Sequence, residues 1–73
     1  LVYPIPFTEQ LSVVGSVLQK LLLFDIMGNI VAATSTKNRS KLSLNTSQLS
    51  AGNYLLRIEN SDGATAVRKV VKK

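Results

Sequence analysis

The chain has 73 residues, of which 45% are hydrophobic, and a formal net charge of +5, with neither cysteine nor histidine. A chain of this length forms one small domain, and the missing residue types exclude disulfide bonds, thiolate metal sites and cysteine or histidine catalysis. The longest apolar run, Leu21 to Phe24, is far shorter than the roughly 20 residues of a membrane-spanning helix. We therefore expect a folded domain that does not span a membrane, holds no metal or cofactor and is not an enzyme.

Positive charge is concentrated in two short segments. Four of the nine basic residues lie within residues 68–73, and three more lie within residues 37–41. Single-strand nucleic-acid binders interleave such charges with aromatic side chains that stack on bases, but this chain has only two Tyr and two Phe. Nucleic acid is therefore not an expected partner.

Short runs of β-branched and apolar residues, separated by Gly, Asn, Asp and Ser, favour strands over helices throughout the chain. They predict strands over residues 9–14, 20–25, 30–34, 41–45, 53–59 and 64–72. The nearly continuous apolar run at 20–25 is typical of a central strand covered on both faces. Leu42 and Leu44 alternate with polar residues and should face the core, whereas the polar and basic residues 36–40 are predicted to form a solvated loop.

Two turns share one spacing. Asp25 to Gly28 and Asn60 to Gly63 each place Asn or Asp three residues before Gly, as in the type I turn of a short hairpin loop. Gly52 ends a third turn, and the strand after it places three side chains on one face, those of Tyr54, Leu56 and Ile58. Six to seven short, mostly antiparallel strands with turns at this spacing predict an all-β fold, a small β-sandwich.

The last strand carries charge on both faces. Arg68 and Lys72 share one face, and Lys69 and Lys73 share the other. Neither face is suited to full burial, so the strand is expected to be an edge protected by charge or one whose register is weakly fixed. The second case would allow a homodimer formed by swapping the terminal strand.

Four segments occur in a characteristic order. They are Tyr3-Pro4-Ile5-Pro6-Phe7, Phe24 to Val31, Leu49 to Leu56, and Arg68 to Lys72. Together they resemble the C-terminal sorting domain of type IX secretion cargo, a family of the Bacteroidota. The resemblance covers nearly the whole chain, although Ile5 stands where the family usually has Asn, and Asn53 where an apolar residue is more common.

The resemblance implies an immunoglobulin-like β-sandwich, with residues 1–73 as a single C-terminal sorting domain of a longer secreted protein. Such a domain directs its cargo from the periplasm through the type IX outer-membrane translocon to the outer-membrane surface or the extracellular space. In many members a sortase-like peptidase then removes the domain and anchors the cargo to the cell surface. The resemblance places secretion-signal recognition on Gly52, Tyr54, Lys69, Val70, Val71, Lys72 and Lys73.

An accessory β-sandwich for adhesion or carbohydrate binding is the alternative function. Such a module needs an exposed aromatic platform, and four aromatic side chains are few from which to build one. Saturable glycan binding that is lost on Tyr3→Ala or Phe7→Ala would favour this alternative.

Overall fold

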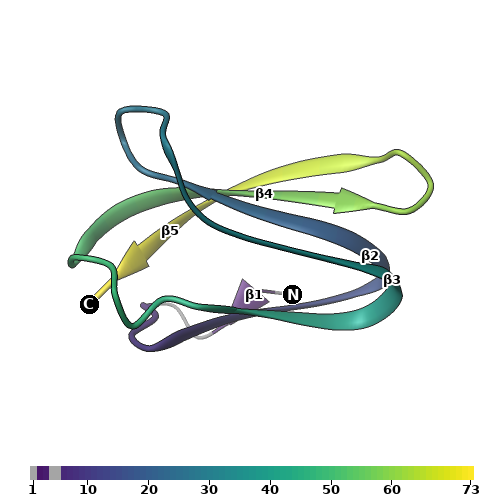
Figure 1. Cartoon of the computed structure of the whole chain (residues 1–73), viewed down its shortest axis with the longest axis horizontal. Helices are drawn as coiled ribbons and strands as arrows, with labels where there is room; N and C mark the ends of the chain where they lie inside the picture. Colours follow the sequence, from purple (N-terminus) through teal and green to yellow (C-terminus); the bar gives the residue numbers. More distant parts are fainter. Residues whose placement is uncertain (1, 4–5) are drawn as a thin grey trace.

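The computed structural model describes residues 2–3 and 6–73, and these residues form strands and turns without a helix. The strands are β1 (Val2–Tyr3), β2 (Gln10–Phe24), β3 (Ile30–Asn45), β4 (Gly52–Asn60) and β5 (Thr65–Lys72). All strand pairs are antiparallel and belong to one sheet, in which β2 lies between β3 on one side and β1 and β4 on the other, and β5 follows β4. Figure 1 shows this sheet curled into two layers, which are joined where β2 and β3 bend.

The prediction of a small antiparallel β-sandwich is confirmed, with the difference that one curled sheet supplies both layers. The segments expected at 9–14 and 20–25 are the two halves of β2, and those expected at 30–34 and 41–45 are the halves of β3. Counted by halves, the described chain has seven strand segments. The predicted loop at 36–40 is wrong, because β3 stays paired with β2 through the bend.

Irregular pairing lets the long hairpin bend without ending. The register between β2 and β3 shifts between Val14 and Leu18 and again between Leu18 and Lys20, and such bulges increase local twist and bending. Gly15 lies in this bend, and a Cβ atom there would be 3.0 Å from Cδ2 of Leu18, a buried core residue. The prediction that the first strand ends at residue 14 is therefore wrong, because Gly15 permits a close approach to Leu18 within a continuous strand.

The core lies between the two layers. Its buried side chains come from every strand except β1 and from the segment before β2. They are Phe7, Leu11, Val13, Leu18, Leu21, Leu23, Leu42, Leu44, Tyr54, Leu56, Ile58 and Val70. The predicted inward faces of the strands at 41–45 and 53–59 are confirmed, and Leu22, on the opposite face of β2, is only 9% exposed. The central strand is thus covered on both faces, as its apolar run predicted.

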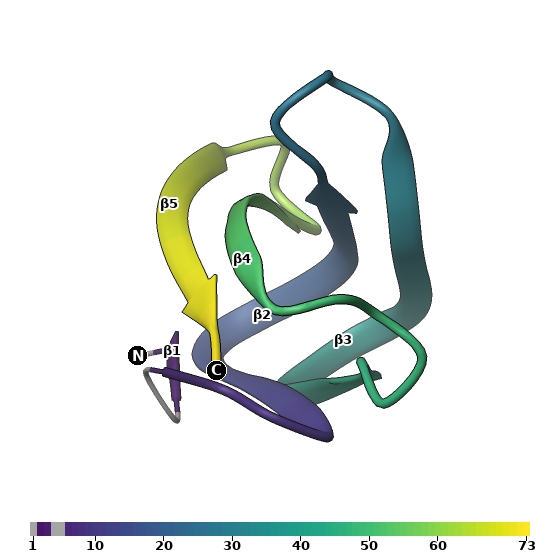
Figure 2. The same cartoon turned by 90° about the vertical axis from the view of Figure 1, so that its left-hand side faces the viewer.

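The segment just before β2, at Phe7, joins the two layers through backbone hydrogen bonds to the end of β5. Phe7 forms a parallel bridge with Lys72: its N–H donates to the Val71 carbonyl, and its own carbonyl accepts the N–H of Lys73, both at 2.9 Å. Figure 2 shows this segment passing beside the end of β5. Pro4 and Ile5, in the first of the four sequence segments, lie outside the described residues.

Candidate recognition surface

The seven residues assigned to secretion-signal recognition lie together, where β4 begins and β5 ends. Gly52 pairs with Lys72, and Tyr54 pairs with Val70. Because side chains alternate between the two faces of a strand, the seven residues divide into two groups. Tyr54, Val70 and Lys72 are buried on the inward side next to Gly52. The exposed group on the outward side is Lys69, Val71 and Lys73.

Lys72 is only 8% exposed although it carries a charge. Its Nζ donates hydrogen bonds to the carbonyl oxygens of Thr46 and Leu49, in the loop between β3 and β4. Thr46 is fully buried and is held in turn by hydrogen bonds from its N–H to the Glu9 carbonyl and from its hydroxyl to the Thr8 carbonyl, both at 2.9 Å. The expectation that neither face of the last strand suits burial is wrong here, because backbone carbonyls replace water around the ammonium group.

Tyr54 and Gly52 also act on the fold. The Tyr54 ring packs in the core against Phe7, with ring centroids 6.1 Å apart and planes tilted by 55°. Its hydroxyl donates to the Ser50 carbonyl at 2.5 Å, which fixes the turn before β4. Gly52 has a φ of +150°, a conformation that residues with a Cβ atom rarely adopt. These two residues shape the start of β4 and offer little to a partner.

The exposed group continues onto the neighbouring strand and forms a surface that is both basic and apolar. Lys69 pairs with Leu55 of β4, whose side chain is 45% exposed, and Val71 beside it is 41% exposed. We call Leu55, Lys69, Val71 and Lys73 the outer strip. Leu55 is not among the recognition residues predicted from the sequence, yet the alternation in β4 is a sufficient signal, because it places Leu55 opposite the core-facing residues.

The turn at residues 25–28 borders the outer strip. Ile26 and Met27 are both 80% exposed at its tip, and Ile26 lines a shallow apolar hollow together with strip residues. The Asp25 carboxylate accepts the backbone N–H groups of Asn29 and Met27, both at 2.9 Å. These hydrogen bonds, that of Asn29 foremost, hold the pKa of Asp25 below its ordinary value of 3.8. The turn therefore presents two apolar side chains on a well-defined backbone.

The second hairpin turn, at residues 60–63, joins β4 to β5 at the end of these strands that is opposite the recognition residues (Figure 1). The N–H of Gly63 donates to the Asn60 carbonyl at 3.0 Å, and Gly63 has a φ of +92°. The Asp62 carboxylate accepts the N–H of Ala64 at 3.0 Å. This turn orients β4 and β5 but lies apart from the recognition residues.

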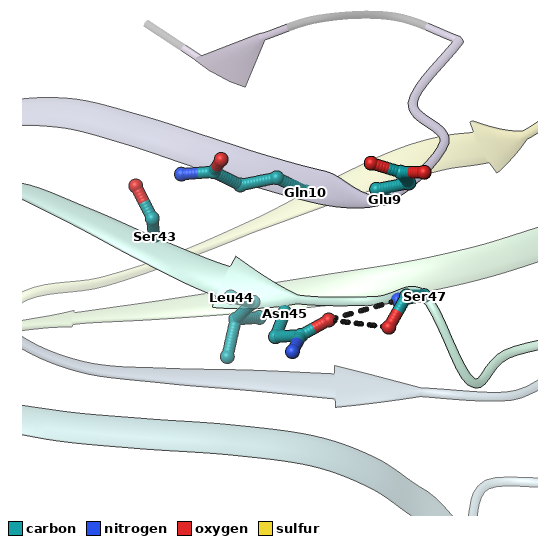
Figure 3. A pocket seen from close by; sticks show the side chains of 6 residues that line it. All are labelled: Glu9, Gln10, Ser43, Leu44, Asn45 and Ser47. Carbon is teal, nitrogen blue, oxygen red and sulfur yellow. Dashed lines mark hydrogen bonds between the residues drawn. The ribbon is translucent and has the colours of Figure 1, made fainter.

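A polar hollow between the ends of β2 and β3 offers little chemistry (Figure 3). It is lined by Glu9, Gln10, Ser43, Leu44, Asn45 and Ser47. In this hollow Asn45 Oδ1 accepts hydrogen bonds from the N–H and the hydroxyl of Ser47. Glu9 is the only carboxylate in the described part of the lining, so the hollow has no carboxylate pair for general acid–base catalysis. Among the described residues we find no cluster of His, Cys, Asp or Glu that could hold a metal, and no helix suited to crossing a membrane.

Fold and surface together define a small all-β domain that exposes a basic and apolar strip on its last two strands. The family model of the secretion system C-terminal sorting domain matches residues 1–73, the whole chain. The chain belongs to this family and is a C-terminal sorting signal of type IX secretion. Membership implies a secreted cargo protein and interaction with the secretion machinery, and the family is not known as catalytic. No curated protein matches the chain.

Proposed function

We propose that residues 1–73 act as a folded sorting module at the end of a longer secreted protein. The module directs its cargo from the periplasm through the type IX outer-membrane translocon, which recognises the outer strip. The inward residues act indirectly by holding that strip in place: they are Gly52, Tyr54, Val70 and Lys72. The division of one cluster into a buried half and an exposed half supports this assignment.

A fusion to a periplasmic reporter, in a host that has the secretion system, tests the proposal. Deleting residues 71–73 should keep the reporter in the periplasm, but this deletion also removes the Lys72 hydrogen bonds and the Phe7 bridge. A point variant separates recognition from folding. Lys69→Glu reverses an exposed charge without touching the core, and Arg39→Glu reverses an exposed charge on β3 as the matched control.

The two charge reversals should differ only in transport. We expect Lys69→Glu to reduce surface display of the reporter at least about tenfold, as expected for the loss of a favourable charge contact of ordinary strength. Arg39→Glu should leave display close to that of the parent fusion. Equal display from both variants, with both folded, would show that the outer strip is not the recognised surface.

We further propose that a sortase-like peptidase removes the domain after export and leaves the cargo at the outer-membrane surface or outside the cell. Removal shortens the exported reporter by the mass of the domain, 7.9 kDa. Immunoblotting of surface and culture fractions distinguishes a cleaved reporter from a retained one. The domain itself is proposed to have no catalytic role.

An adhesion or carbohydrate-binding role has less support. Phe7 and Tyr54 are buried, and Tyr3 and Phe24 are only partly exposed, so the four aromatic side chains do not form a platform. Saturable glycan binding that is lost on Tyr3→Ala would favour this alternative. A homodimer formed by swapping β5 stays a prediction, and the mass of the domain in solution tests it.

A further inference from the structure

The outer edge of β5 has backbone groups that no other described segment pairs. Val71 and Lys73 point their backbone groups away from β4, since they bond to Phe7. Backbone groups alternate in direction along a strand, and the pairing of β4 with β5 is regular over its whole length. The N–H and C=O groups of Thr65, Val67 and Lys69 therefore point away from β4 as well.

The edge of β5 differs from the edge of β3. The pairing of β3 with β2 shifts register three times, which breaks the row of backbone groups that a partner strand would need. Segment 65–69 of β5, whose outer edge is not paired with any other described segment, has regular pairing with β4 behind it, and its side chains are exposed on both faces. The same edge already accepts one extended segment of this chain, at Phe7.

Charge indicates what kind of strand would fit. Segment 65–69 carries Arg68 on one face and Lys69 on the other, and neither forms an ion pair with a described carboxylate. The nearest acidic side chain across the β4–β5 ladder, Glu59, is engaged by Arg57 at 3.5 Å. Like charges in a partner strand would be repelled, and the whole domain carries +5.

We propose that β5 accepts an acidic extended segment of a partner protein as an additional strand at residues 65–69. Backbone hydrogen bonds to Thr65, Val67 and Lys69 supply the attachment, and carboxylates beside Arg68 and Lys69 supply the selectivity. This inference rests on the proposed function, because it describes how a component of the secretion machinery engages the edge next to the outer strip.

A short synthetic peptide of repeated Glu-Glu-Thr-Thr, which places carboxylates on both faces of an added strand, is the probe, and a peptide of repeated Lys-Lys-Thr-Thr is its control. Amide hydrogen exchange of the 73-residue domain should slow at least about tenfold at Thr65, Val67 and Lys69 when the acidic peptide saturates it. Binding should weaken as salt rises, because the charges are exposed. The basic peptide should cause no protection.

Val67→Pro removes one outward N–H without touching the ladder to β4, and Val67→Thr keeps that N–H with a side chain of similar shape. We expect the acidic peptide to bind Val67→Pro at least about tenfold more weakly than Val67→Thr. The double variant Arg68→Glu, Lys69→Glu provides a second test. It should bind the basic peptide more tightly than the acidic peptide. Both tests require that the variants keep the unfolding midpoint of the parent within a few degrees.

Three results would overturn the inference. They are equal binding of the two peptides, equal affinity of Val67→Pro and Val67→Thr, and protection of residues 65–69 that rises with domain concentration alone, which would assign the edge to a second copy. The reporter fusion separates the two proposals. If the Val67→Pro and Val67→Thr fusions are exported equally, strand addition is refuted and the sorting function stands. If residues 1–73 do not export the fused reporter at all, the sorting function itself is refuted.

Discussion

Replacing Lys72 with Met removes the ammonium group that bonds the Thr46 and Leu49 carbonyls and keeps an unbranched apolar stem. A hydrogen bond to a charged group contributes about 1.5 to 3 kcal/mol net, and a buried carbonyl left without a partner costs a similar amount. Since the Leu49 carbonyl is only partly buried, we take the lower value for each bond. The variant should lose about 3 kcal/mol of the free energy of unfolding, or roughly 12 to 24 °C in Tm for a domain of this size.

Urea unfolding followed by far-ultraviolet circular dichroism measures this loss. Lys73→Met is the matched control, because Lys73 is the exposed neighbour and the substitution is chemically identical. The control should change the free energy of unfolding by less than about 0.5 kcal/mol. If Lys72→Met and Lys73→Met are equally stable, the two carbonyl bonds do not hold the β3–β4 loop, and the structural role given to Lys72 is wrong.

Three further substitutions test the core and the turns. Leu56→Ala empties a fully buried site and should cost about 2 to 5 kcal/mol in urea unfolding, and a cost below about 1 kcal/mol would contradict its central position. Gly63→Ala should cost about 1 kcal/mol, since no atom crowds the site but φ is +92°; an unchanged midpoint would contradict that conformation. The Asp25 carboxyl should titrate below 3.8 in a chemical-shift titration, because its pKa in the folded state is depressed. The stabilisation of the turn by this carboxylate is therefore fully present above pH 3.8 and is lost as the pH falls through the folded-state pKa. In Asp25→Asn this acid-side loss of stability should be absent, and a carboxyl pKa at or above 3.8 would contradict the hydrogen bonds from Asn29 and Met27.

Strands and inward faces could be predicted because their causes are local. The inward positions in the strands at 41–45 and 53–59 follow from alternation, which needs only neighbouring residues. The apolar run at 20–25 likewise predicted a strand covered on both faces, and Leu22 is indeed covered. Local patterns were sufficient wherever the structure depends on period and burial alone.

The bend and the closure of the sandwich depend on contacts between distant residues. A glycine followed by a polar residue is typical of a strand end, and nothing in the sequence shows that Gly15 instead gives room to Leu18 inside a continuous strand. The bridge between Phe7 and Lys72 joins opposite ends of the chain, which no local pattern encodes. These features require knowledge of the curl of the sheet.

The charges of the last strand show most clearly what the sequence alone conceals. Lys69 and Lys72 are chemically identical and three residues apart, so alternation places them on opposite faces. Only the position of the β3–β4 loop decides that the inward ammonium meets two carbonyls, whereas the outward one meets solvent. The two lysines should therefore fail in different ways when replaced: Lys72 through loss of stability, and Lys69 through loss of recognition in a domain that remains folded.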